Sequence, residues 1–132
     1  MIVLDTHVIL WTRLDEDRLG GNARVEIDRA WASEEVAVSA ISFWEIALLQ
    51  QKGRIRFPED VAHWRRELLD QGIVEIAVNG SIAVRAIGLP EFHADPADRM
   101  IVATALEGHR LVTADRRILG WSGPLSRIRA DR

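Results

Sequence analysis

Short apolar runs alternate with amphipathic segments along the whole sequence of 132 residues. Residues 2–4 and 36–38 are continuous apolar runs, which is typical of strands buried on both faces of a parallel sheet. Further strands are expected at residues 73–78, 110–113 and 125–128, the last of them at an edge. Helices are expected where the apolar periodicity is helical, at residues 6–11, 23–31, 43–49, 58–71, 80–87, 96–106 and 116–119.

Strands and helices that alternate in this way predict an α/β fold. Helices that connect parallel strands cover both faces of the sheet, so we expect a three-layer α/β/α domain with a central, mainly parallel sheet. The sequence has no internal repeat, linker or low-complexity segment, and residues 1–132 are therefore expected to form a single domain.

Capping and turn residues mark the expected helix ends. Asn22 and Asn79 are expected to cap the second and fifth helices, and Pro58 to open the fourth. Gly53 and Gly72 are expected to end the third and fourth helices.

The helix expected after residue 95 begins with two acids and continues with apolar residues on nearly every side. Asp95 is suited to the N-cap, Pro96 to the first helical position and Asp98 to the first turn. Because the following residues are almost all apolar, this helix is expected to be buried. Two carboxylates therefore stand at its N-terminus, where the helix dipole favours negative charge.

Four acidic residues are expected at one edge of the sheet. Asp5 and Asp115 stand where the first strand and a later strand end, Glu45 lies in the first turns of the helix after the second strand, and Asp98 opens the buried helix. In parallel α/β sheets the functional crevice lies beyond the carboxyl ends of the strands. The four carboxylates are thus predicted to line that crevice.

Each acid can also be interpreted as a helix cap, and Ser42 with Glu45 fits a capping box. Glu45, however, is expected to be enclosed by Phe43, Trp44 and Ile46, and burying a lone carboxylate is costly. Four converging carboxylates repel one another unless a cation lies among them. The pattern therefore favours a metal site over four separate caps.

The residue types indicate which metal. The sequence has no cysteine, which excludes thiolate ligands and a disulfide framework, and its four histidines are scattered. Carboxylates without such partners suit Mg²⁺, with Mn²⁺ as a substitute, better than zinc. His93 lies near the acids, but we expect it to be a loop or capping residue and not a ligand.

Net charge and the N-terminal sequence narrow the functional class. A net charge of −3 argues against broad nucleic-acid binding, although 16 of the 17 basic residues are arginines, which suit phosphate. The bias toward arginine could also reflect genome composition. No signal peptide or membrane-spanning run is evident, so a cytoplasmic protein without membrane contact is expected.

Four segments, taken together and in this order, resemble the PIN-domain ribonucleases and, within them, the VapC-like toxins of bacterial type II toxin–antitoxin modules. They are residues 4–7 (Leu-Asp-Thr-His), 42–47 (Ser-Phe-Trp-Glu-Ile-Ala), 95–99 (Asp-Pro-Ala-Asp-Arg) and 111–115 (Leu-Val-Thr-Ala-Asp). The resemblance covers nearly the whole chain, and the length is typical of the family.

The resemblance implies a PIN-like fold and Mg²⁺-dependent endonucleolytic cleavage of RNA. Asp5, Glu45, Asp98 and Asp115 correspond to the acidic quartet that serves as catalytic and metal-binding residues, and Thr113 to the polar residue that accompanies it. Thr6, within the first segment, is a further candidate supporting residue. The resemblance also implies a homodimer and inhibition by a small antitoxin. Ala97 stands where relatives often carry an aromatic residue, which should alter packing or substrate fit.

Three alternatives have different sequence requirements. A phosphate-accepting receiver domain needs a lysine after a late strand, but Lys52 is the one lysine; a haloacid-dehalogenase-like phosphatase needs an acid at the position of His7. The remaining alternative is a non-catalytic PIN-like module that binds nucleic acid or protein. Trp11 and Trp64 are expected to be core residues, with a groove for a partner as the alternative.

Overall fold

The computed structural model describes all residues, 1–132, and contains one five-stranded sheet. The strands are β1 (Ile2–Leu4), β2 (Val36–Ser39), β3 (Val74–Ile76), β4 (Arg110–Thr113) and β5 (Ser126–Arg129). They lie in the order β3-β2-β1-β4-β5, and every neighbouring pair is parallel. The predicted parallel sheet and the edge position of its last strand are confirmed.

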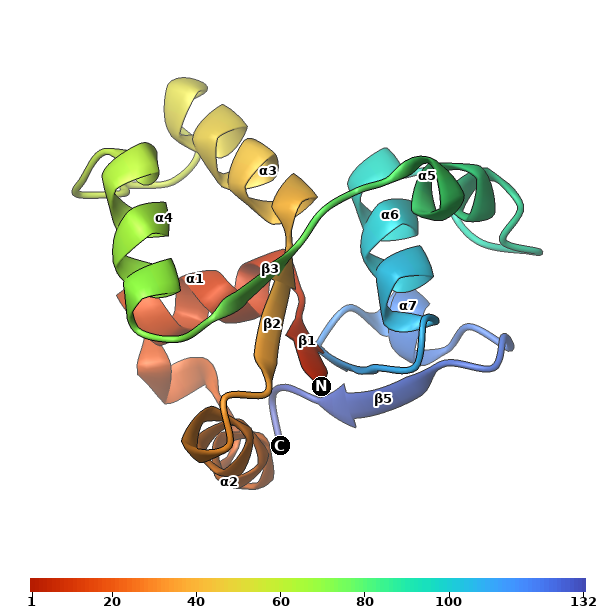
Figure 1. Cartoon of the computed structure of the whole chain (residues 1–132), viewed down its shortest axis with the longest axis horizontal. Coiled ribbons are helices and arrows are strands. Elements are labelled where there is room, and N and C mark those ends of the chain that lie inside the picture. Colours follow the sequence, from red (N-terminus) through yellow and green to blue (C-terminus); the bar gives the residue numbers. More distant parts are fainter.

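Seven α-helices and one 3₁₀ turn connect the strands (Figure 1). The helices are α1 (Thr6–Leu14), α2 (Gly21–Ala32), α3 (Ala40–Gln51), α4 (Val61–Asp70), α5 (Gly80–Ile87), α6 (Pro96–Ala105) and α7 (Arg116–Leu119), and the 3₁₀ turn η1 covers Glu16–Arg18. None of these helices combines the length and apolar character needed to cross a lipid bilayer.

Side chains that alternate along the strands build one core on each face of the sheet. Leu4, Val38 and Val112 point to the face covered by α1, α2, α3 and α4. Val3 and Leu111 point to the opposite face, where α6 and α7 pack, and α5 packs on α6. Successive residues of a strand face opposite sides of the sheet, so a strand that is buried on both faces needs a continuous run of apolar residues. The three-layer α/β/α fold is confirmed (Figure 1).

Two helices begin earlier than the sequence predicted. The N-cap of α2 is Gly20, not Asn22, because the Ala23 N–H donates to the main-chain oxygen of Arg132, a partner remote in sequence. The N-cap of α3 is Ser39, whose hydroxyl accepts from the Ile41 N–H, so the proposed capping box that begins at Ser42 is wrong. Ser42 is fully buried instead.

Two other elements are shorter than predicted. The helix expected from Pro58 begins at Val61, because Asp60 accepts from the Ala62 N–H and caps it. The third strand covers residues 74–76 of the predicted 73–78. Asp95 caps α6 with Pro96 in its first turn, and Asn79 caps α5, both as predicted.

Candidate metal and catalytic site

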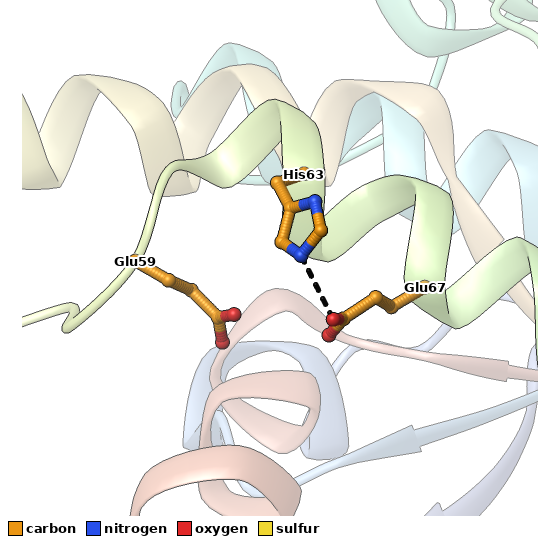
Figure 2. Close-up of side chains that lie close together, drawn as sticks. All are labelled: Glu59, His63 and Glu67. Carbon is orange, nitrogen blue, oxygen red and sulfur yellow. Dashed lines mark ion pairs between the residues drawn. The ribbon is translucent and has the colours of Figure 1, made fainter.

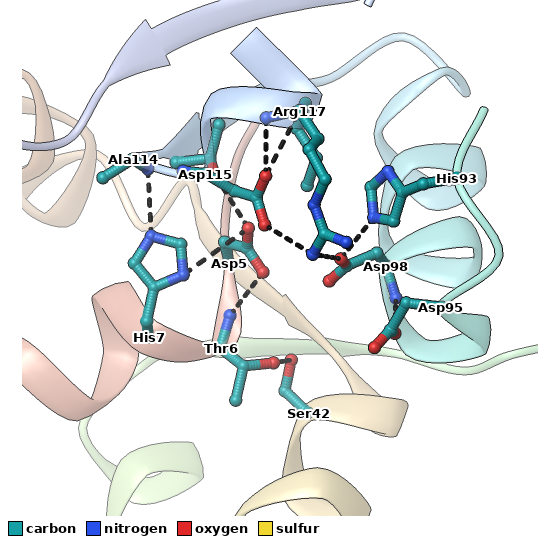
Figure 3. A network of polar contacts seen from close by, with 12 residues as sticks. Asp5, Thr6, His7, Ser42, His93, Asp95, Asp98, Ala114, Asp115 and Arg117 are labelled. Carbon is teal, nitrogen blue, oxygen red and sulfur yellow. Dashed lines mark hydrogen bonds and ion pairs between the residues drawn. The ribbon is translucent and has the colours of Figure 1, made fainter. Parts of the chain in front are cut away.

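The carboxylates of Asp5, Asp98 and Asp115 converge where β1 and β4 end and α1, α6 and α7 begin (Figure 3). Asp5 and Asp115 are the N-caps of α1 and α7, because β1 and β4 end at this edge and each is followed directly by a helix. Asp98 lies in the first turn of α6, which follows α5 and a loop. The topology therefore brings Asp5 together with two acids that lie more than ninety positions later in the sequence.

Asp5 is the deepest of the acids, with 2% of its surface exposed. One oxygen accepts the Thr6 N–H at 2.8 Å, and the other accepts the Thr113 hydroxyl at 2.8 Å. Thr6 in turn donates its hydroxyl to Ser42 at 2.9 Å, which joins α1 to α3. Burial raises the pKa of Asp5, and the charge of Asp115 acts in the same direction.

His7 links the Asp5 region to the loop after β4. Its Nε2 accepts the Ala114 N–H at 2.9 Å, and its Nδ1 lies 3.7 Å from Asp5 Oδ2. Because Nε2 is the acceptor, the neutral ring carries its proton on Nδ1, on the side of Asp5. The sequence analysis gave His7 no role in the site. Its position two residues after Asp5, in the first turn of α1, was the available signal.

A hydrogen bond of 2.6 Å joins His93 Nε2 and Asp98 Oδ2. The His93 ring stacks on Phe92 with a centroid distance of 4.3 Å. The side chains of His93 and Asp98 are mostly buried. His93 therefore lies in the loop before α6, as expected, and its ring is in direct contact with a site acid. The conformation of the loop before α6 orients the His93 ring toward Asp98, and local sequence does not specify this conformation.

Asp98 and Asp115 have opposite pKa shifts. Burial raises the pKa of Asp98, and the charges of Asp5, Asp95 and Asp115 raise it further, against the hydrogen bond from His93. Burial also acts to raise the pKa of Asp115, but hydrogen bonds from the N–H groups of Arg117 and Ile118 outweigh it, and the pKa is lowered. Asp115 is thus the acid that stays ionised most readily.

Glu45 is half-buried on α3 and not enclosed as predicted. Phe43 and Ile46 are buried, but Trp44 is 57% exposed, because only one face of α3 packs against the core. Burial still raises the pKa of Glu45, and the charges of Asp98 and Asp5 raise it further. Glu45 therefore belongs electrostatically to the same group of acids.

The guanidinium group of Arg117 lies between two of the acids. Its Nη2 is 3.6 Å from Asp98 Oδ2 and 3.5 Å from Asp115 Oδ2 (Figure 3). Arg117 was not predicted from the sequence, because the contact of its guanidinium group with Asp98 and Asp115 depends on the conformation of the side chain.

The donor set fits a divalent cation that prefers oxygen. His93, Asp98 and Asp115 each offer a ligand atom, and these atoms lie within 4.8 Å of one another. Burial raises the pKa values of Asp5, Glu45 and Asp98, and the charges of neighbouring acids act in the same direction. Carboxylates in this state are suited to Mg²⁺ or Mn²⁺, and His93 also suits Mn²⁺.

A second group of metal-ligating side chains lies on α4 and the loop before it (Figure 2). Glu59 is paired with Arg13, with a separation of 2.8 Å, and His63 Nε2 lies 2.9 Å from Glu67 Oε1. His63 and Glu67 are exposed. These ion pairs account for the group without a metal.

Two open hollows flank the acidic site. One, of about 390 Å³, includes His93 and Arg117 in its lining, and the other, of about 490 Å³, includes His7 and Asp115. A third cavity, of about 440 Å³, is remote from the acids and lies among α1, α2 and α4. Trp64 lines this third cavity, whereas Trp11 lines the hollow beside His7, so the two tryptophans do not share a groove.

Comparisons with known proteins agree with this geometry. The family model of the PIN domain matches residues 2–120. Ribonuclease VapC22 of Mycobacterium tuberculosis is 40% identical over 125 residues, which cover 93% of each chain.

Solved structures show the same fold at low identity. A chain of the DNA-bound VapBC complex from Salmonella typhimurium superposes with a TM-score of 0.70 at 15% identity, covering 96% of both chains. A chain of a toxin–antitoxin complex from Klebsiella pneumoniae gives 0.66 at 21% identity, covering 98% of this chain and 97% of that one.

Proposed function

The chain belongs to the PIN-domain family, and from this premise we propose that it is a metal-dependent endoribonuclease, the toxin of a toxin–antitoxin module. One observation carries the proposal: the carboxylates of Asp5, Asp98 and Asp115 converge at the carboxyl edge of the sheet, in a chain 40% identical to a named ribonuclease. Glu45 completes the quartet through its charge coupling to Asp5 and Asp98.

In this proposal Asp5, Glu45, Asp98 and Asp115 hold Mg²⁺ or, as a substitute, Mn²⁺. A bound ion of this kind lowers the pKa of its water and stabilises charge during in-line displacement at phosphorus. The surrounding residues orient the ligands. Thr6 and Thr113 fix both oxygens of Asp5, and His93 holds one oxygen of Asp98 so that the other is free to face the ion.

An RNA chain would approach the acids along the two hollows that flank them. One hollow has Arg117 in its wall and the other has Arg18 and Trp11. Arginine binds phosphate through a planar fork of donors. The net charge of −3 is then compatible with RNA binding, because the basic groups needed are local.

The cavity among α1, α2 and α4 is the proposed docking groove of a small antitoxin. Its apolar lining includes Ile9, Ile27 and Trp64, and charged residues such as Arg24 and Glu67 also contribute. Such a groove fits the apolar face of an amphipathic helix. An antitoxin that also brings an arginine or lysine to the acids would take the place of the metal charge.

A homodimer is part of the same proposal. Trp44, Val84 and Ile87 are large apolar side chains with 57%, 75% and 80% exposure, on α3 and α5. Helices α3 and α5 both pack on α6, and large apolar side chains exposed on them are candidates for an interface. A mass measurement in solution tests it: twice the chain mass is expected, and a monomer at micromolar concentration contradicts it.

The experiment for the catalytic proposal is RNA cleavage by purified, antitoxin-free protein. Cleavage is expected with Mg²⁺ or Mn²⁺, is expected to stop with EDTA, and to return when excess Mg²⁺ is added. RNA binding without cleavage under all these conditions would favour the non-catalytic PIN-like module. Cleavage at full rate in EDTA would contradict the metal mechanism.

A further inference from the structure

Arg117 is the cation nearest to the candidate metal site, and no other arginine side chain contacts these acids. Its guanidinium bridges Asp98 and Asp115 at 3.6 and 3.5 Å, whereas Arg99 and Arg127 spend their donors on main-chain oxygens. The neighbouring Arg116 makes no side-chain contact with the acids. Arg117 thus supplies positive charge where the carboxylates need it.

The bridge is loose and can be released without unfolding the site. Charge-assisted hydrogen bonds are typically about 2.7–2.9 Å, and both Arg117 separations are longer. The Arg117 side chain is 62% exposed, so its guanidinium can leave the acids for water at little cost. The cap of α7 does not depend on it, because the Arg117 main-chain N–H donates to Asp115 Oδ1.

The position of Arg117 also gives its guanidinium access to a phosphate group of the RNA. The hollow of about 390 Å³ whose wall includes Arg117 also includes His93, the residue in contact with Asp98. An RNA strand that reaches the acids through this hollow must pass its phosphates along the guanidinium. A phosphate accepts two parallel hydrogen bonds from arginine, which is a stronger arrangement than the present bridge.

We propose that Arg117 exchanges partners: it bridges Asp98 and Asp115 in the metal-free protein and binds a backbone phosphate of the RNA when a divalent cation occupies the acids. The exchange follows from charge, because the guanidinium and the cation compete for the same two carboxylates. This inference rests on the proposed function and assigns a substrate-binding residue and a metal-sensitive contact to the same site.

The first test is metal affinity in the absence of RNA, measured by calorimetric titration of the protein with Mn²⁺. R117Q is expected to bind Mn²⁺ about two- to fivefold more tightly than the wild type, which is the range expected for removing an exposed ion pair. R116Q, the matched control on the same helix, is expected to bind Mn²⁺ like the wild type. Equal affinity in all three proteins overturns the proposed exchange.

The second test is the salt dependence of RNA binding, read by fluorescence anisotropy of a labelled single-stranded RNA with Ca²⁺ in place of Mn²⁺. Loss of one phosphate contact should lower the slope of log affinity against log salt by about one in R117Q. In EDTA the difference in slope between R117Q and wild type should be smaller, because Asp98 and Asp115 then compete with the phosphate for the guanidinium. A gel after the measurement verifies that the RNA is intact.

The outcomes separate this inference from the proposed function. Tighter Mn²⁺ binding with an unchanged RNA slope overturns the phosphate contact. A slope lowered equally in EDTA and in Ca²⁺ overturns the dependence of that contact on metal. No Mn²⁺ binding by any of the three proteins would refute the metal site itself. Metal-dependent cleavage with none of the expected differences would uphold the proposed function and overturn the role of Arg117.

Discussion

Asp98 carries a charge that the metal-free fold disfavours, since burial and three neighbouring acids raise its pKa. Asp98→Asn keeps the size of the side chain and an oxygen that accepts from His93, and it removes the charge. In EDTA we expect the free energy of unfolding to be unchanged or higher by up to about 1 kcal/mol. Thermal melts check this, and Mg²⁺ should raise the melting temperature of the wild type more than that of the variant. A loss of several degrees in EDTA would instead mark Asp98 as a structural cap.

The same pair of proteins predicts a pH dependence. A carboxyl whose pKa is raised on folding destabilises the fold at neutral pH, and this penalty disappears as pH falls through the raised pKa toward the ordinary value of 3.8. The difference in melting temperature between Asp98→Asn and wild type should therefore be largest at pH 7 and shrink on acidification. A variant that melts below the wild type at pH 7 and approaches it as pH falls would show that the folded-state pKa of Asp98 is depressed.

Sequence could identify the acids but not the side chains that surround them. Asp5 and Asp115 follow strands and Asp98 opens a helix, so their common edge follows from topology. The contacts of His7, His93 and Arg117 depend on ring orientation and side-chain reach, which no periodicity encodes. The predicted enclosure of Glu45 failed for a related reason, because residues beside it in sequence lie on different faces of α3.

At the scale of elements, the side chains of Arg99 and Trp121 hold the loop before α6. Arg99 donates to the main-chain oxygens of His93 at 2.8 Å, Phe92 at 2.6 Å and Ala86 at 2.9 Å. Trp121 supports the same loop through its Nε1–H, which donates to the Pro90 oxygen at 2.8 Å. The last residue of the Asp-Pro-Ala-Asp-Arg segment therefore fixes the position of His93 and, through it, of Asp98.

Arg99→Lys tests whether the hydrogen bonds of the Arg99 guanidinium, and not its charge alone, stabilise the loop before α6. Lysine keeps the charge but cannot reach three carbonyls in a plane, so we expect a loss of about 2–4 kcal/mol in the free energy of unfolding. Urea denaturation measures it. Arg85→Lys is the matched control, because Arg85 is exposed and makes one long contact of 3.5 Å. Equal free energies of unfolding for Arg99→Lys and Arg85→Lys would show that the hydrogen bonds of Arg99 contribute little to stability.

The elements themselves were largely predictable, and their ends were less so. Continuous apolar runs located β1 and β2, because a central parallel strand has no polar face. The edge strand β5, which is mostly polar, lies at residues 126–129 and not at the predicted 125–128. The predicted start of α2 at Asn22 was wrong, because the main-chain oxygen of Arg132 replaces a local cap as the acceptor. The chain at Gly20 also passes so close to Arg132 that a Cβ at this position would lie 2.1 Å from the Arg132 backbone. Such contacts are remote in sequence, and local capping rules do not include them.

At the scale of the whole molecule, the acidic site and the groove among α1, α2 and α4 are separate surfaces. Trp31 lines that groove and is 38% exposed, so truncating it should not disturb the core. Trp31→Ala is expected to weaken binding of the antitoxin by about 30-fold, the effect of losing a buried aromatic anchor. RNA cleavage by the isolated variant should be unchanged.

Val25→Ala is the control for that measurement, because Val25 lies on α2 and is 54% exposed but does not line the groove. Calorimetric titration with the purified cognate antitoxin gives the affinities. Equal affinities of Trp31→Ala, Val25→Ala and wild type would show that the antitoxin binds elsewhere.

The most direct test of the account is the rate of Mg²⁺-dependent RNA cleavage by Asp5→Asn relative to wild type. Asparagine preserves an oxygen to accept the Thr6 N–H, so the start of α1 should stay intact. If the four carboxylates form the catalytic metal site, the rate should fall by at least about 100-fold, with an unchanged circular dichroism spectrum. A folded Asp5→Asn protein that cleaves RNA within about threefold of the wild-type rate would contradict the central claim.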